Sequence, residues 1–126
     1  MPIKRVDVTS VYVNDQDAAL DFFVGKLGME KLRDEPMGPE SRWVQVKPKG
    51  AESSLVLVKG FGDWTPEKVG RLQSFTFWTD DATATAEELR HAGVEISQEP
   101  APQPWGMTEV RFKDLDGNEH LLYGPA

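Results

Sequence analysis

Two short stretches, 66 positions apart, decide the fold: Val11-Tyr12-Val13-Asn14-Asp15 and Phe77-Trp78-Thr79-Asp80-Asp81. Both are rich in apolar residues and end in Asp, and each precedes a stretch with helical periodicity. The periodic stretches end in similar ways, at Leu27-Gly28-Met29-Glu30 and at Ala92-Gly93-Val94-Glu95. A strand-to-helix unit that occurs twice at one spacing predicts an internal repeat.

Each predicted helix has a capping residue, an apolar face and a glycine stop. Asp15 and Asp81 can accept hydrogen bonds from the first backbone N–H groups of the helices. Gly28 and Gly93 suit the left-handed conformation that follows a last helical turn. The residues predicted to face inward are Ala19, Phe22, Phe23 and Leu27 in the first copy and Ala82, Ala86 and Leu89 in the second.

The remainder of each copy predicts strands. Residues 42–46, 53–58, 108–113 and 119–123 combine β-branched or aromatic residues with flanking turn signals. The same offset of 66 aligns Trp43 to Val46 with Glu109 to Phe112, and Leu55 with Leu121. Asp116-Gly117-Asn118 predicts a hairpin turn.

These elements predict an α+β fold built from two βαβββ modules in tandem. The modules are residues 1–59 and 67–126, joined by the linker 60–66, within one domain that spans 1–126. A helix covers only one face of each module's sheet, so the modules can cover their other faces by curving around a shared cleft. We expect the sheets to be mostly antiparallel.

Composition and charge exclude several classes of protein. The net charge of −7 argues against a nucleic-acid partner, since phosphate backbones attract basic surfaces. The chain has no cysteine, which removes disulfides and thiolate metal sites. Neither a signal peptide nor a membrane-spanning run is visible, so we expect a cytoplasmic protein without a membrane partner.

Three stretches of the chain resemble the vicinal oxygen chelate superfamily, which includes glyoxalases, bleomycin resistance proteins and extradiol dioxygenases. They are the opening Val11 to Gly28 unit, Trp105-Gly106, and Asp114-Leu115-Asp116-Gly117-Asn118. Leu115 departs from the family pattern, which usually has Pro there. The resemblance implies a glyoxalase-like fold of paired modules, often assembled as a homodimer, and either metal-dependent enzymes or metal-free binding proteins.

In catalytic members of the superfamily, the resemblance implies His, Glu or Gln metal ligands at two positions of each module. In this chain those positions hold Val8, Leu55, Ser74 and Leu121. Valine and leucine have no donor atoms, and a serine hydroxyl is a weak ligand. We therefore expect no metal at the family positions and no cofactor. Asp7 and His120, each one residue away, should point to the helix side because side chains alternate along a strand.

The strand faces opposite the helices predict a small-molecule site with aromatic walls. Alternation places Val44, Val46, Val110 and Phe112 under the helices and their neighbours on the open faces. The candidate ligand-binding residues are Tyr12, Trp43, Gln45, Trp78, Trp105, Glu109, Arg111 and Tyr123. Glu109 and Glu119 are the candidates for acid–base or metal chemistry.

The sequence leaves open whether the protein is an enzyme. The first possibility is metal-independent binding of a small organic molecule, aromatic or cationic, for sequestration or detoxification. The alternative is a metal-dependent lyase, isomerase or dioxygenase whose ligands lie outside the family positions, such as Glu109 and Glu119. A third possibility is an accessory dimer with a vestigial cavity.

Overall fold

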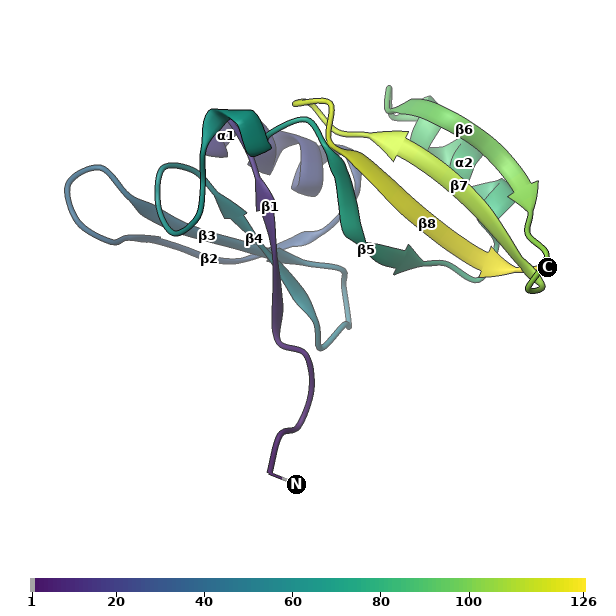
Figure 1. Ribbon diagram of the computed structural model, residues 1–126, viewed down its shortest axis with the longest axis horizontal. Helices are drawn as coiled ribbons and strands as arrows, with labels where there is room; N and C mark the ends of the chain where they lie inside the picture. The colour runs from purple at the N-terminus through teal and green to yellow at the C-terminus, as the bar shows by residue number, and fades with distance from the viewer. Residues whose placement is uncertain (1) are drawn as a thin grey trace. The chain divides into compact units, whose positions relative to one another are not determined.

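The computed structural model describes residues 2–126, and the chain divides into two compact units, Met1–Val69 and Gly70–Ala126. Each unit contains a four-stranded sheet with helix on one side (Figure 1). The predicted α+β fold with two βαβββ modules is confirmed.

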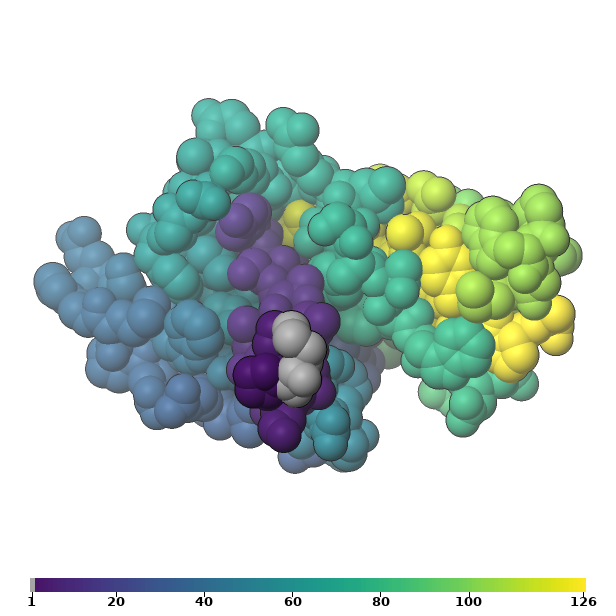
Figure 2. Space-filling view, turned by 60° about the horizontal axis from the view of Figure 1, so that its bottom comes forward, coloured from purple at the N-terminus to yellow at the C-terminus, as the bar shows by residue number. Residues whose placement is uncertain are grey.

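The first unit follows the predicted strand–helix–three-strand order. Its strands are β1 (Val8–Tyr12), β2 (Glu30–Pro36), β3 (Arg42–Lys47) and β4 (Ser54–Val58), and its helical segments are α1 (Gln16–Leu20), η1 (Asp21–Lys26) and η2 (Pro66–Lys68). The sheet order is β1-β4-β3-β2, with β1 parallel to β4 and the other two pairings antiparallel. Residues 2–7, which precede β1, are exposed (dark purple in Figure 2).

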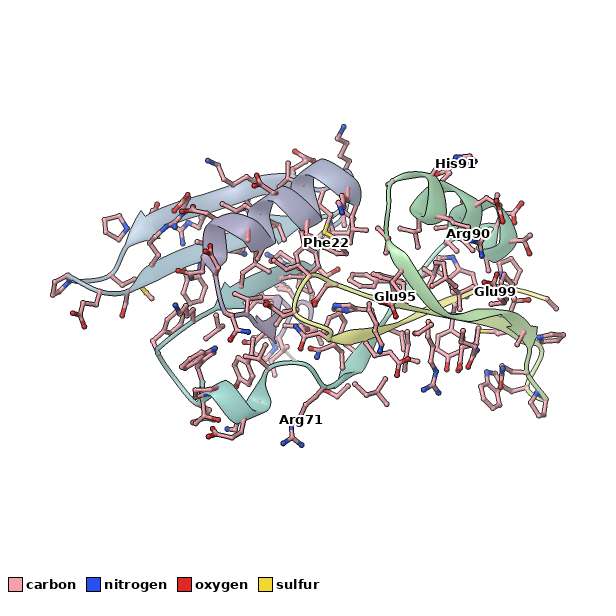
Figure 3. The ribbon with its side chains drawn as sticks, turned by 90° about the horizontal axis from the view of Figure 1, so that it is seen from above. Phe22, Arg71, Arg90, His91, Glu95 and Glu99 are labelled. Carbon is pink, nitrogen blue, oxygen red and sulfur yellow. The ribbon has the colours of Figure 1, made fainter. Side chains whose placement is uncertain are left out.

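The second unit repeats this topology. Its elements are β5 (Leu72–Trp78), α2 (Ala82–His91), β6 (Glu95–Pro102), β7 (Met107–Lys113) and β8 (Glu119–Pro125). The sheet order is β5-β8-β7-β6, again with one parallel pairing, between β5 and β8. Arg90 of α2 pairs with Glu99 of β6, so the helix and the edge strand are also joined by charge (Figure 3).

Both predicted helix caps are confirmed. The Asp15 carboxylate accepts from the Ala18 N–H at 3.0 Å, and the Asp81 carboxylate accepts from the Ala84 N–H at 3.0 Å. Gly28 and Gly93 have φ values of 72° and 83°, the left-handed conformation expected of glycine stops.

The first helix differs from the prediction because it changes type after Leu20. Residues 21–26 form a π-helical segment, in which the Leu27 N–H donates to the Phe22 carbonyl at 3.1 Å. The wider turn coincides with two adjacent buried rings, Phe22 and Phe23, packed edge to face. Leu27, predicted to face inward, is only half-buried, and Met29 is buried beyond it.

The four strand residues that were predicted to pack under the helices are buried. Val44, Val46, Val110 and Phe112 are all buried, with at most 2% of their surface exposed. In the second unit, a Cβ added at Gly124 of β8 would lie 3.1 Å from the Ala82 backbone nitrogen, so the start of α2 packs directly on this face of the sheet.

The predicted turn at Asp116-Gly117-Asn118 is present. Hydrogen bonds of the Asn118 side chain connect it to neighbouring segments. Gly117 takes a φ of 77°. The Asn118 side-chain oxygen accepts from the Gly70 N–H at 2.7 Å, and its amide donates to Asp114 at 2.9 Å. This buried asparagine therefore joins the β7–β8 turn to the segment that leads into β5.

None of the helices within residues 2–126 has the length and apolar character needed to cross a membrane.

Candidate functional site

The open face of the second unit's sheet gathers most of the predicted site residues. The register pairs Trp78 with Tyr123, Tyr123 with Glu109, and Arg111 with Leu121. Paired residues on neighbouring strands point to the same side, so these side chains share the face opposite α2. The second unit therefore brings together five of the eight predicted ligand-binding residues, four on the sheet and Trp105 on the turn before β7.

Glu109 lies at the centre of this face. Its side chain is only 7% exposed. One carboxylate oxygen accepts from Arg111 Nε at 3.0 Å and from Gln98 Nε2 at 3.0 Å, and the other accepts from the Tyr123 hydroxyl. Three donors thus hold a buried carboxylate in a fixed orientation.

These hydrogen bonds shift the pKa values of the cluster. Burial alone would raise the pKa of Glu109, but the donors Tyr123, Arg111 and Gln98 together outweigh it and hold that pKa below its ordinary value. The bond to the carboxylate, followed by burial, raises the pKa of Tyr123 above its ordinary value. The same carboxylate raises the pKa of Arg111. Glu109 is consequently ionised and Tyr123 neutral at neutral pH.

Glu119 joins the cluster through Arg111. Its carboxylate lies 3.6 Å from Arg111 Nη1, and its other oxygen accepts from the Ser97 hydroxyl at 2.7 Å. The two carboxylates predicted as candidates for chemistry are therefore both tied to one guanidinium. The cluster of these three side chains carries two negative charges and one positive charge.

Two tryptophan rings lie beside Tyr123, the aromatic member of this polar cluster. Trp78 is 60% exposed and Trp105 is 59% exposed. The Trp105 ring lies 6.5 Å from the Tyr123 ring, measured between centroids, on a tight turn in which Gly106 has a φ of 90°. The unit thus presents flat apolar surfaces beside a fixed polar cluster.

The remaining predicted ligand-binding residues lie in the first unit. Gln45 donates to the Ser54 hydroxyl at 2.7 Å and accepts from the Trp43 indole N–H at 2.9 Å. Its Cα partner on β4 is Val56, whereas Tyr12 has Val58 as partner on the same strand. Tyr12, Trp43 and Gln45 therefore share one face of the first sheet.

The register corrects one of the four metal-ligand positions inferred from the family. Leu55 pairs with Thr9 and Val46, which places it on the helix-covered face rather than beside Val8. Val56, the partner of Gln45, corresponds to Leu121, the partner of Arg111. The repeat offset therefore falls from 66 to 65 in the last strand of the module. The corrected position, Val56, also has no donor atom for a metal ion.

Among residues 2–126, no three His, Asp or Glu side chains lie close enough to share a metal ion. His120 points to the helix side, as predicted: it is fully buried, stacks on Phe112 with ring centroids 5.2 Å apart, and has Nε2 2.9 Å from Asp114. His91 is exposed at the end of α2 (Figure 3).

Sequence reasoning missed Gln98 and Ser97, which complete the cluster from β6. The alternation that identified the other strands is obscured in Glu95–Pro102 by polar residues and two prolines. The signal that was available was the position of this segment in the repeat, since a third strand was expected in each module.

Residues 5–120 match the model of the Glyoxalase/Bleomycin resistance protein/Dioxygenase superfamily. The protein YetH of Bacillus subtilis (strain 168) is 41% identical over 120 residues, which are 95% of this chain and 98% of YetH. A probable lactoylglutathione lyase of Synechocystis is 26% identical, over 86% of both chains.

Solved structures with similar sequences have the same fold. TnmS3, an antibiotic binding protein from Streptomyces sp. CB03234, is 41% identical with a TM-score of 0.83, covering 100% of this chain and 99% of TnmS3. A superfamily member from Sphaerobacter thermophilus is 32% identical with a TM-score of 0.87, covering 98% and 99% of the two chains. The chain therefore belongs to the glyoxalase, bleomycin resistance protein and dioxygenase superfamily.

Proposed function

We propose that this protein binds a small aromatic molecule without a metal ion, on the open sheet face of residues 70–126. One observation carries the proposal: two exposed tryptophans, Trp78 and Trp105, lie beside Tyr123, whose hydroxyl donates to a carboxylate of fixed orientation. A site with flat apolar walls and a few placed polar groups is typical of small-molecule recognition. The likeness to an antibiotic binding protein supports this direction.

The polar cluster sets which charge the ligand carries. Two carboxylates face one guanidinium, so the cluster has a net negative charge. An uncharged or cationic aromatic molecule is favoured over an anionic one. The indole faces add to this preference, because tryptophan attracts cations over its ring.

The alternative is a metal-dependent lyase, isomerase or dioxygenase that uses Glu109 and Glu119, and the likeness to probable lactoylglutathione lyases is the observation in its favour. The hydrogen bonds at Glu109 disfavour metal binding by this carboxylate. Both of its oxygens already accept from Arg111, Gln98 or Tyr123. A metal would have to displace these donors, and Arg111 would repel it.

The test is a thermal-shift screen on chelator-treated protein with three probes of similar shape: acridine, N-methylacridinium and anthracene-9-carboxylate. The proposal expects stabilisation by the first two probes, because a ligand that binds only the folded state raises its stability. A protein that responds only after Zn²⁺, Ni²⁺, Mn²⁺ or Fe²⁺ is added would support the alternative. A protein that responds to none of the probes or metals would overturn both.

We further propose that the protein is a homodimer that sequesters its ligand in the cytoplasm. The family resemblance supports this assembly, and sedimentation velocity tests it. A single species with twice the mass of the chain is expected, and a monomer at micromolar concentration contradicts it.

A further inference from the structure

The first unit carries a second set of aromatic residues, but its own chain already occupies them. The segment 60–69 follows β4 and returns across the unit through the short helical turn η2 (teal in Figure 1). Phe61 and Trp64 of this segment are half-buried, whereas Gly62, Asp63 and Thr65 between and beside them are exposed. The segment therefore turns its rings inward.

Three contacts of this segment fall on a predicted ligand-binding residue or its neighbour. The Phe61 ring stacks on Trp43, with centroids 6.4 Å apart and planes inclined by 30°. The Lys68 ammonium lies 5.9 Å from the centroid of the Tyr12 ring. The Trp64 indole N–H donates to the Val13 carbonyl at 2.9 Å and anchors the segment between these two contacts.

The chemistry of the occupant indicates what the covered face recognises. An aromatic ring lies against Trp43 and a cation lies over Tyr12, which together are the two features of an aromatic cation. In the second unit, by contrast, Trp78 and Trp105 are exposed.

We infer that segment 60–69 is a built-in occupant of a latent site for an aromatic cation, formed by Tyr12, Trp43 and Gln45. The chain then has one open ligand face, in the second unit, and one face that opens only when the segment is displaced. Gly60 and Gly70, with φ values of 75° and 86°, bound the segment at positions where glycine allows the chain to turn. The inference rests on the proposed function only for the open face, because the latent site is argued from contacts within the first unit.

The test is a calorimetric titration of the full chain with N-methylacridinium, using acridine as the uncharged control of the same shape. The variant Phe61→Ala/Lys68→Ala removes the ring and the ammonium but keeps the Trp64 anchor. Lys59→Ala is the matched control, since it removes an exposed positive charge from the same unit beside the segment. Both variants are titrated in the otherwise unaltered chain and also in a chain that carries Trp78→Ala/Trp105→Ala, which removes the aromatic rings of the open face.

The expected result is one additional equivalent of N-methylacridinium per chain in Phe61→Ala/Lys68→Ala, in both backgrounds, and none in Lys59→Ala. Phe61→Leu, which keeps an apolar side chain, gives a smaller gain and shows that the effect does not arise from unfolding. Unchanged stoichiometry in a folded Phe61→Ala/Lys68→Ala variant overturns the inference. If the unaltered protein binds no probe but this variant binds one equivalent, the proposed function of the open face fails and the latent site stands.

Discussion

Tyr123 and Glu109 are cross-strand partners on β8 and β7, and the Tyr123 hydroxyl donates to the Glu109 carboxylate. This bond joins the aromatic part of the site, where Tyr123 lies beside Trp105, to the polar part, where Glu109 is held by Arg111. A change at either residue is therefore expected to affect both the stability of the second unit and its affinity for a ligand.

Glu109→Gln is expected to lower the free energy of unfolding by about 1–3 kcal/mol. Arg111 loses a charged partner, and the donors Gln98 and Tyr123 lose a carboxylate acceptor. Urea unfolding followed by circular dichroism measures this change. The control is Glu99→Gln, which alters an ion pair at the surface and should cost less than about 1 kcal/mol. Equal effects of the two substitutions would show that the cluster does not stabilise the fold.

Tyr123 is expected to ionise at a pH above its ordinary value of 10.0, because its proton is held by the Glu109 carboxylate. The chain has two tyrosines, so in Tyr12→Phe the tyrosinate absorbance reports Tyr123 alone. This bond contributes fully to stability below 10.0 and its contribution is lost as the pH rises through the folded-state pKa. In Tyr12→Phe/Glu109→Gln the titration should shift back toward 10.0; a titration that does not move would contradict the hydrogen bond.

Trp78→Ala/Trp105→Ala should leave stability within about 0.5 kcal/mol per site, because both side chains are largely exposed. Affinity for an aromatic probe should fall roughly tenfold or more, since each ring contact contributes about 0.5–1.5 kcal/mol beyond its buried area. Leu32→Ala, an exposed apolar residue on β2 of the other unit, is the control for loss of surface apolar area. Fluorescence anisotropy of the probe separates these outcomes, and equal affinity of all three proteins would place the ligand elsewhere.

Asn118→Ala is expected to be strongly destabilising, by about 3 kcal/mol. The fully buried side chain accepts from the N–H groups of Gly70 and Arg71, and leaving buried donors without an acceptor costs about 1–3 kcal/mol each. Leu115→Ala, in the same turn but exposed, should change stability little. Thermal unfolding compares the two variants, and similar melting temperatures would contradict the fastening role of Asn118.

Much of the fold could be predicted because its signals are local. Asp15 and Asp81 cap helices, Gly28 and Gly93 end them, and alternating valines mark the covered sheet faces, all of which follow from spacing along the chain. β2 escaped a residue-level prediction because its seven residues are all exposed and show no apolar alternation. A strand of this kind forms through pairing with β3 rather than through burial.

Most residues of the site could be predicted from the sequence, but the hydrogen bonds between them could not. Alternation placed Glu109, Arg111 and Tyr123 on one face, yet nothing in the sequence tells that Gln98 reaches Glu109 from an irregular strand. The shift of the repeat offset at Leu55 arises in the same way. The offset depends on the length of the β3–β4 turn, and the alternation of apolar residues does not indicate that length.

The most direct test of the central claim is an isothermal titration of acridine and N-methylacridinium into chelator-treated protein, beside the same titration into Trp78→Ala/Trp105→Ala. The account predicts that the unaltered protein binds without metal, that added Zn²⁺ or Ni²⁺ leaves the affinity unchanged, and that the double variant binds at least tenfold more weakly. Binding that appears only with a metal, and that Glu109→Gln abolishes while Trp78→Ala/Trp105→Ala does not, would contradict it and favour the enzyme.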